Sequence, residues 1–529
     1  MQIIQLYVDD NKCLVDFDIH FEIDRYQGSS TILIGENGTG KSSMLQTVLE
    51  IMMSFDSDAI AKRIQYQYSI EYYYKGSTVI IQQSGKHYNL SIDGKLFCEG
   101  SLKIVKERLA AEHKSLFPER INYFYSGLND HALAGMRRVG ANYTIACRNN
   151  IARYWNALYL ASHEYEGVFP KRKYIYCTES LVPVYLIALL CGNDSSGKEY
   201  LLEQCHISQV ERVSTIISVK KLRSKLQNDV VEIGLEGVLD LIGFIDDGFT
   251  EQFRAGFLYQ NDEDFVFEMQ NISQIDADTV SFFDFFEKLS TIFEAEFGVT
   301  VRVGNSSVYC HNLSEGQRQL IKILGMLCIC KDEDTLVLMD EPDAHMNPKW
   351  KYELKSTIDS CLSSAVNTQA IIATHDPMVI NGVSKELIRV FLHNNAIADH
   401  DGYYFTKVVA PTEETEGLGI DGLLQSEYYG LKTSYDKKTS DKFIRRQKLY
   451  SKLINGEAND EEKEQLRELT KEIGSLPVSY NSIDFLYDDF IRVFKNTDLF
   501  AKEYLSFDEV SRRREKIREI IKALYEGQV

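Results

Sequence analysis

The chain has 529 residues, of which 44% are hydrophobic and 26% charged, a composition typical of a globular protein with several domains. Its formal net charge of −20 excludes a surface that is basic throughout, so contact with nucleic acid would need a local basic patch or a partner chain. The ten cysteines include no CxxC pair. Because Cys328 and Cys330 lie in an apolar run without a second pair, we expect buried, reduced thiols instead of a metal site.

The first 130 residues predict an amino-terminal lobe with strands, one glycine-rich loop and antiparallel hairpins. Three apolar runs predict strands, near residues 3–8, 15–23 and 31–34. The third runs into the glycine-rich loop and a helix over about 41–53. Alternating residues over 63–98 predict hairpins, with turns at Lys75-Gly76, Ser84-Gly85 and Asp93-Gly94. A helix over about 102–113 and a strand over 121–125 precede the sequence SGLND.

The remaining chain divides into three further parts. Residues 131–297 predict a mainly helical insertion with a hairpin near Phe257–Met269, and no heptads indicate a long coiled coil. Residues 298–410 alternate strands with helices, and residues 411–529 predict a polar, helical carboxyl-terminal region. The longest apolar run, Leu181–Cys191, is shorter than the roughly 20 residues that cross a bilayer, so we expect a core helix in a cytoplasmic protein without membrane contact.

The glycine-rich loop, GENGTGKSS, fits the phosphate-binding pattern G-x-x-x-x-G-K-[ST] between a strand and a helix. Glycines let successive backbone N–H groups turn toward phosphate oxygens, while Lys41 reaches the β- and γ-phosphates and the Ser42 hydroxyl ligates magnesium. The alternative is a chance glycine turn. The predicted ATP-binding residues of this loop are Gly35, Glu36, Asn37, Gly38, Thr39, Gly40, Lys41, Ser42 and Ser43.

Two further apolar strands end in residues suited to hydrolysis. The strand over 336–339 ends in Asp340-Glu341-Pro342, where Asp340 is predicted to hold the magnesium shell and Glu341 to activate the attacking water. The strand over 370–374 ends at His375, a catalytic candidate that would be structural if it stood alone. Because open α/β sheets bind ligands at the carboxyl ends of their strands, these groups are expected at one edge.

The sequence LSEGQRQ, Leu313–Gln319, opens an apolar helix that runs to about Cys330. Ser314 and Gln317 also fit a capping box, the structural alternative. In the order phosphate loop, LSEGQ, DEP and histidine, the chain resembles the ABC ATPase superfamily in its SMC-like, non-transporter branch. The resemblance implies a P-loop ATPase head with a mixed sheet and an antiparallel β lobe. It also implies a homodimer in which Ser314, Gly316 and Gln317 face the ATP of the other subunit.

Several residues depart from the pattern of that superfamily. Glu315 replaces the commoner glycine, and Asn347 takes the place of an aspartate that transporters carry. No glutamine marks a Q-loop, for which Asn129 is the candidate substitute. The aromatic residue that stacks on adenine is left open between Tyr7, Phe17 and Phe21.

Four stretches are similar to bacterial anti-phage ATPases of the Septu and retron-effector type: YSGLND, DEPDAHMNPKW, ATHDPMVI, and the tail sequences GLGIDGLLQSEYYGL and DFLYDDF. The resemblance implies an ATP-driven dimer that regulates an HNH-type nuclease subunit, in some systems with a reverse transcriptase and its RNA–DNA hybrid. The alternatives are a stand-alone SMC-like DNA-repair ATPase and a transporter motor subunit. The large insertion and the missing Q-loop glutamine disfavour the transporter.

We expect no nuclease activity from this chain, because the tail offers no glutamate with a DxD, and Asp276 and Asp278 lie outside a suitable strand pattern. Candidate nucleic-acid contacts are three local basic patches, for each of which a solvated face is the alternative. They consist of Lys171, Arg172 and Lys173; Lys220, Lys221, Arg223 and Lys225; and the final helix with Arg512, Arg513, Arg514, Lys516, Arg518 and Lys522.

Overall fold

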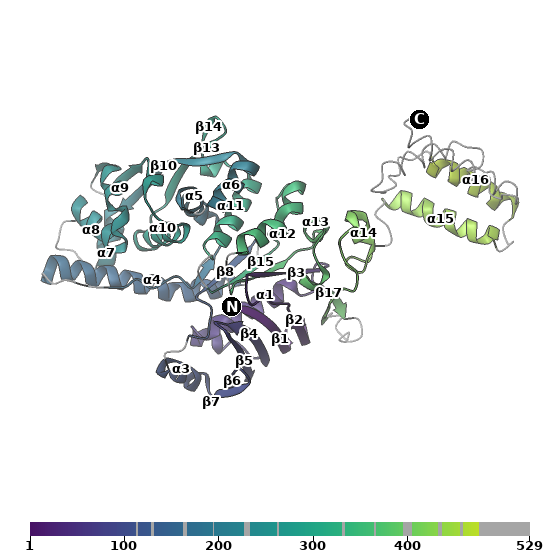
Figure 1. The fold of residues 1–529 in the computed structure, drawn as a ribbon, viewed down its shortest axis with the longest axis horizontal. Coiled ribbons are helices and arrows are strands. Elements are labelled where there is room, and N and C mark those ends of the chain that lie inside the picture. The colour runs from purple at the N-terminus through teal and green to yellow at the C-terminus, as the bar shows by residue number, and fades with distance from the viewer. Residues whose placement is uncertain are drawn as a thin grey trace. The chain divides into compact units, whose positions relative to one another are not determined.

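The computed structural model describes most of the chain, which divides into two units, residues 1–432 and 433–529. The described residues are 1–112, 115–127, 132–161, 165, 167–193, 195–226, 233–261, 264–330, 334–363, 365, 367–394, 405–431, 436–454 and 459–474. Asn129, the tail sequence DFLYDDF and the final basic helix lie outside them. The first unit contains three sheets and the helices that cover them (Figure 1).

The central sheet has seven strands in the order β18-β17-β3-β16-β15-β8-β9. They are β3 (Ser29–Gly35), β8 (Arg120–Tyr125), β9 (Tyr174–Tyr176), β15 (Thr335–Asp340), β16 (Gln369–Ala373), β17 (Ile388–Asn394) and β18 (Phe405–Val409). All neighbours are parallel except β17 and β18. Every residue of β3, β15 and β16 is buried, which explains their uninterrupted apolar sequences, since parallel strands are covered on both faces.

Alternate residues of these strands enter two different cores. Leu338 and Ile371 pack in the core that includes α1 (Lys41–Ser54), whereas Val337 and Ile372 pack in the core that includes α11 (Glu315–Cys328) and α12 (Pro348–Leu362). The sheet is therefore sandwiched between helices. This arrangement, with its antiparallel partner lobe, is the fold of an ABC-type P-loop ATPase.

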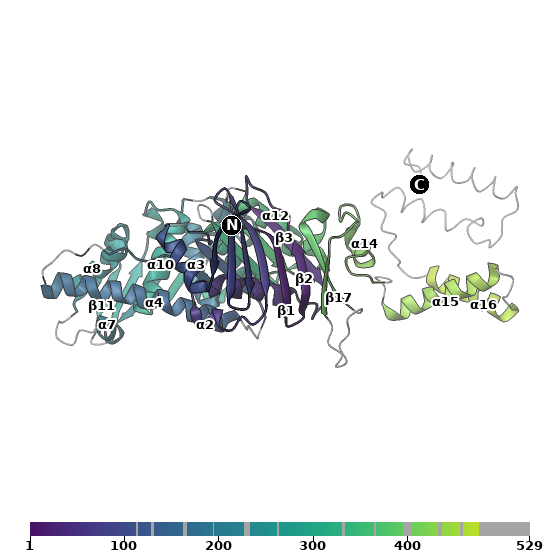
Figure 2. The ribbon, with the colours of Figure 1, turned by 90° about the horizontal axis from the view of Figure 1, so that it is seen from below.

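The antiparallel lobe is a six-stranded sheet in the order β2-β1-β4-β5-β6-β7, whose strands run side by side in Figure 2. Its strands are β1 (Gln2–Asn11), β2 (Leu14–His20), β4 (Tyr68–Tyr74), β5 (Ser77–Ser84), β6 (His87–Ile92) and β7 (Lys95–Gly100). The three predicted hairpin turns are confirmed, because β4 to β7 pair consecutively around them. Helix α3 (Leu102–Ala111) packs against β6 and β7, and α2 (Asp58–Ala61) contacts α1.

The insertion combines helices with a five-stranded sheet in the order β11-β12-β10-β13-β14, whose last two strands extend beyond the predicted boundary at residue 297. Its helices are α4 (Ala132–Asn156), α5 (Val182–Cys191), α6 (Ser195–Cys205), α7 (Val219–Leu226), α8 (Leu235–Ile245), α9 (Thr250–Ala255) and α10 (Thr279–Phe293). Its strands are β10 (Ile207–Ser218), β11 (Phe257–Gln260), β12 (Asp264–Met269), β13 (Phe297–Val303) and β14 (Ser306–Tyr309). The hairpin of β11 and β12 and the core helix α5, all of whose residues are buried, confirm two predictions; the long strand β10 was not predicted.

Beyond β16 the chain continues along the sheet edge. The short helix α13 (Pro377–Ile380) follows His375 and contacts α14 (Gly419–Gln425), and Leu423 and Tyr428 are buried in the larger core. In the second unit, α15 (Lys437–Ile454) and α16 (Asp460–Gly474) pack against each other. None of the helices formed by described residues combines the length and hydrophobicity that crossing a bilayer requires.

Candidate nucleotide site

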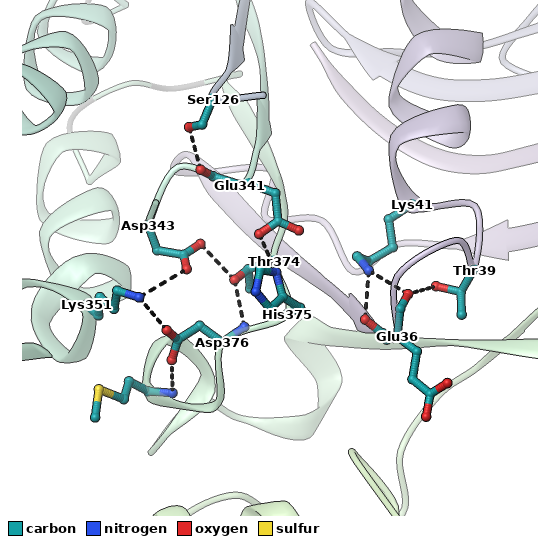
Figure 3. Close-up of polar contacts among 12 residues, drawn as sticks. Glu36, Thr39, Lys41, Ser126, Glu341, Asp343, Lys351, Thr374, His375 and Asp376 are labelled. Carbon is teal, nitrogen blue, oxygen red and sulfur yellow. Dashed lines mark hydrogen bonds and ion pairs between the residues drawn. The ribbon is translucent and has the colours of Figure 1, made fainter. Parts of the chain in front are cut away.

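Four parallel strands deliver the predicted site residues to one edge of the central sheet. β3 ends at the phosphate loop, β15 at Asp340, β16 just before Thr374-His375, and β8 just before Ser126. Their register aligns these ends, because Asp340 pairs with Ala373 on one side and with Tyr125 on the other. The structure thus brings together the glycine loop, the carboxylate pair and the histidine. Figure 3 shows Lys41, Glu341 and His375 at this edge.

The loop over 35–40 adopts a conformation that depends on its glycines. Gly35, Gly38 and Gly40 have φ values of 149°, 83° and 97°, which other residues rarely adopt. A Cβ at Gly35 would lie 2.2 Å from the Phe391 carbonyl oxygen, and one at Gly40 would lie 2.3 Å from Thr406 Oγ1. Glu36, Asn37 and Thr39 complete the turn, which Thr39 closes by donating to the Glu36 carbonyl at 2.8 Å.

Helix α1 begins at Lys41 directly after this loop, and no side chain caps its first N–H groups. Its first turn contains no acidic residue, and Ser42 and Ser43 are half-buried there. An uncapped helix N-terminus after a glycine loop binds anions well, because the free N–H groups and the helix dipole both favour negative charge. This end of α1 therefore fits a phosphate group.

The Lys41 side chain is buried and folds back over the loop. Its Nζ donates to the carbonyl oxygens of Gly35 at 2.7 Å and Glu36 at 3.1 Å (Figure 3). Burial lowers the pKa of the Lys41 ammonium, while the negative charges of Glu341 and Asp340 oppose this shift. The carboxylates on β15 therefore act electrostatically on the lysine of the loop.

The carboxylate pair lies opposite this lysine. Asp340 is fully buried, and Glu341 adopts a left-handed conformation with φ of 54°. The Glu341 N–H donates to the Ala373 carbonyl at 2.8 Å, and its Oε2 lies 2.6 Å from Nδ1 of the half-exposed His375. Burial raises the pKa of Glu341, which the nearby His375 and Lys41 partly offset. A carboxyl with a raised pKa at this position is suited to accept a proton.

A set of polar residues that the sequence did not predict lies next to this pair, in the loops after β15 and β16 and in α12. Buried Asp343 accepts a hydrogen bond from Thr374 Oγ1 at 2.7 Å, and the same hydroxyl accepts from the Asp376 N–H at 3.0 Å. Lys351 donates to Asp376 at 2.7 Å and lies 4.0 Å from Asp343 (Figure 3). These contacts join the loops that follow β15 and β16. The sequence signal was the run of polar residues after each strand, in DEPD and THD.

The residues of the LSEGQ sequence form the start of α11. The capping box is present, since the Ser314 hydroxyl accepts from the Gln317 N–H at 3.2 Å and Gln317 Oε1 accepts from the Ser314 N–H at 3.0 Å. Ser314 and Glu315 are exposed. A Cβ at Gly316 would lie 3.0 Å from the His345 carbonyl oxygen, so this glycine allows α11 to pack closely on the loop after β15. Asn347, at the end of that loop, caps α12 by accepting from the Trp350 N–H at 2.9 Å.

Other candidates have structural surroundings. Asp278 caps α10 through the Ser281 N–H, and Asp276 accepts from Asn193, so the DxD pair holds loops. Cys328 and Cys330 are buried, and no group of three or more His, Cys, Asp and Glu side chains in the described residues is arranged to hold a metal. Phe17 and Phe21 are buried in the core, whereas Tyr7 is half-buried and bonded to Asp16.

The donor set at the strand ends fits one magnesium ion bound together with phosphates. A hydroxyl from Ser42 and a carboxylate from Asp340 supply hard oxygen ligands, and magnesium commonly takes only one or two protein ligands beside substrate phosphates and water. Asp340 is close enough to the loop to act on the charge of Lys41. Ser42 lies in the first turn of α1 and Asp340 is the last residue of β15, so both residues are at the edge where the strands end.

The fold and the groups gathered at this edge are those of an ABC-type P-loop ATPase. A family model described as "AAA domain, putative AbiEii toxin, Type IV TA system" matches residues 235–381, from α8 to α13, without the phosphate loop. Among curated proteins, the chain is similar to the Septu protein PtuA of Bacillus mycoides (strain KBAB4), with 28% identity over 174 residues, 31% of this chain and 22% of that protein.

A second relative is the retron Vc95 probable ATPase of Vibrio cholerae serotype O1 biovar El Tor. It is 23% identical over 422 residues, which cover 75% of this chain and 74% of that protein. Among solved structures, the SMC head domain from Thermotoga maritima aligns with a TM-score of 0.33 and 12% identity, covering 78% of this chain and all of that one. The fold assignment rests on strand order and register, because this TM-score is low.

Proposed function

We propose that the chain is the ATP-hydrolysing regulatory subunit of a bacterial anti-phage complex, a dimer that controls a partner nuclease. One observation carries the ATPase part: the phosphate loop, Asp340, Glu341 and His375 meet at a single sheet edge. The similarity to the Septu and retron proteins supports the defence part.

In this proposal ATP binds with its phosphates over the start of α1. The Lys41 ammonium leaves the carbonyl oxygens of Gly35 and Glu36 and pairs with the β- and γ-phosphates. Ser42 and Asp340 hold magnesium, which when bound neutralises phosphate charge. Because Lys41 is buried, little water remains to screen its attraction to the phosphates.

Glu341 acts on the attacking water. Its carboxylate accepts the water proton at Oε1 or Oε2, and its raised pKa makes it a stronger base than an ordinary glutamate. His375 orients the carboxylate through its contact at 2.6 Å. Such general-base assistance contributes about 10²–10⁴ in rate.

Each nucleotide-binding site is completed by a second copy of the chain. The exposed Ser314, with Gly316 and Gln317 at the start of α11, contacts the γ-phosphate bound by the partner. ATP binding then closes the dimer, and hydrolysis opens it. This movement is transmitted to an HNH-type nuclease subunit through the insertion (131–297) and the tail (411–529). A reverse transcriptase with its RNA–DNA hybrid is a further expected partner; no nuclease activity is assigned to the chain itself.

Two variants test the site. Glu341→Gln should bind ATP and stay dimeric with it while turnover falls by about 10²–10⁴, and Lys41→Ala should lose ATP binding. Phosphate release, equilibrium dialysis of ATP and light scattering measure these three properties. Normal hydrolysis by both variants would refute the site, and a monomer in Glu341→Gln with ATP and magnesium would refute the dimer. Purification with the proteins encoded beside it tests the partner, since recovery without a nuclease contradicts that part.

A second candidate function is direct binding of DNA by an SMC-like repair ATPase. One observation favours it: among the described residues, Arg148, Lys221 and Lys225 lie 2.9, 3.5 and 3.1 Å from the carboxylate of Glu294. Three cations against one anion leave a local positive charge on an acidic protein. A gel shift separates the candidates, because the repair ATPase would bind DNA alone with ATP, and the regulatory subunit would bind little without partners.

A further inference from the structure

The backbone of Glu341 is held from the end of β8. Ser126, the residue after that strand, donates its hydroxyl to the Glu341 carbonyl oxygen at 2.6 Å (Figure 3). The Ser126 N–H also donates to the Asp340 carbonyl oxygen at 3.3 Å. Ser126 therefore contacts the carbonyl groups of both acidic residues at the end of β15.

Ser126 is also hydrogen-bonded to α11, the helix that begins with the LSEGQRQ sequence. Gln319, on α11, is 4% exposed, and its Nε2 donates to Ser126 Oγ at 2.9 Å and to the Pro342 carbonyl oxygen at 3.1 Å. Because only the amide nitrogen can donate to a carbonyl, the contact with Pro342 fixes the orientation of the Gln319 amide. A continuous path of hydrogen bonds thus runs from α11 through Ser126 to the backbone of Glu341.

This path acts on a residue in an unfavourable conformation. A left-handed φ is unfavourable for a residue with a side chain, so Glu341, at 54°, needs surrounding contacts to keep it. Its N–H is fixed by the Ala373 carbonyl and its carbonyl by Ser126. If the second contact is lost, the peptide unit can relax and the carboxylate turns away from its position beside His375.

We infer that Ser126 and Gln319 are positioning residues. They fix the position of the Glu341 carboxylate and couple it to α11 of the same chain. The inference rests on the proposed function. In the dimer, α11 faces the nucleotide of the partner while Glu341 faces its own. Contact of α11 with one nucleotide therefore adjusts the hydrolytic group at the other, so that the two sites hydrolyse cooperatively.

The test uses full-length Ser126→Ala, Gln319→Leu and the double variant. We expect kcat to fall about 10- to 100-fold, the effect of misplacing a catalytic group by about 1 Å, with the affinity for a fluorescent ATP analogue unchanged. The Hill coefficient for ATP should fall toward 1. The double variant should be no slower than the slower single variant, because both act through one path. Ser126→Thr, which keeps the hydroxyl, should retain most activity.

Ser54→Ala is the matched control. It removes a fully buried serine hydroxyl that donates to a backbone carbonyl at 2.7 Å, at the far end of α1. It should keep wild-type kcat and Hill coefficient. Wild-type kcat in both Ser126→Ala and Gln319→Leu, or fully additive losses, would overturn the inference. Glu341→Gln in the same assay separates failure of the proposed function from failure of the inference. If Glu341→Gln hydrolyses ATP normally, the proposed function is wrong. If it is inactive while Ser126→Ala and Gln319→Leu are normal, only the inference is wrong.

Discussion

The edge of the central sheet and the core of the insertion are built in opposite ways. The sheet edge buries Lys41, Asp340 and Asp343 and holds Glu341 and His345 at positive φ. The insertion core is a cluster of phenylalanines, in which Phe249 stacks on Phe285 with ring centroids 3.8 Å apart. Other members of the cluster meet edge to face: Phe253, Phe282 and Phe286.

Stability and activity therefore come from different parts of the molecule. Buried aromatic side chains stabilise the fold through large apolar area and favourable ring geometry. Buried charges and left-handed backbone cost free energy and persist at functional sites because the surrounding structure holds them. Substitutions in the insertion should therefore change stability, and substitutions at the sheet edge should change rate more than stability.

The largest effect on stability is expected from Phe285→Ala. Phe285 is 1% exposed and contacts three other phenylalanines, so its removal should lower the free energy of unfolding by about 3–5 kcal/mol. Urea denaturation followed by fluorescence measures this free energy. Phe257→Ala is the control, and because this ring is half-buried, its removal should lower the free energy of unfolding much less. ATP turnover per folded molecule should be unchanged. A drop in turnover without a loss of stability would show that the phenylalanine core contributes to activity as well as to stability.

Gly316→Ala should have the next largest effect, at the start of α11, where this helix packs on the loop after β15. The new Cβ would lie 3.0 Å from the His345 carbonyl oxygen and 3.3 Å from the Trp350 ring, so overpacking should cost about 1–3 kcal/mol. Gly140→Ala is the matched control, because Gly140 lies in α4 with no atom within 4 Å of its Cβ. That change should stabilise by about 0.5–1 kcal/mol. Equal melting temperatures for the two variants would show that α11 does not pack tightly here.

The two regions also differ in how far the sequence predicted them. The strands β3, β15 and β16 were predicted with their site residues, because fully buried strands leave uninterrupted apolar runs that end in polar motifs. Strand β10 was missed, because register shifts at 207–209 and 210–212 break the alternation of its side chains. A period of two cannot be recognised across two bulges.

The supporting polar residues were missed for another reason. Thr374, Asp376 and Lys351 acquire their roles only when β16 and α12 are brought beside β15, so no local pattern marks them. Gln319 lies inside the recognised LSEGQRQ sequence, yet its contact with Ser126 spans 193 residues. Spacing along the chain predicts which strand ends carry chemistry, and tertiary contacts decide which neighbours hold them. The partner surfaces stay predictions.

Asn347→Ala and Asp278→Ala form a pair of smaller effects, one in each region. Both remove a helix N-cap, the first from α12 and the second from α10, so each should cost about 0.5–2 kcal/mol. Only Asn347→Ala should also lower ATP turnover, because residue 347 ends the loop that begins at Glu341. Melting temperature and phosphate release measure the two outcomes. If Asp278→Ala removed a nuclease activity from the purified chain, the structural role of the DxD pair would be wrong.

The smallest effect is a pH-dependent gain in stability from Glu341→Gln. Burial raises the pKa of Glu341 above its usual 4.5, so the folded state holds the proton more tightly than the unfolded state. Below pH 4.5 the carboxyl is protonated in both states and imposes no penalty. As pH rises from 4.5 through the raised pKa, ionisation increasingly destabilises the fold.

Glutamine at position 341 does not ionise, so the melting temperature of the variant should exceed that of the wild type by about 1–3 °C at pH 7.5 and by less at pH 5. Glu416→Gln, at an exposed carboxylate, is the matched control. A variant that is less stable than the wild type at pH 7.5 would mean that the contact with His375 outweighs burial, and the sheet edge would then resemble the insertion in gaining stability from its own packing.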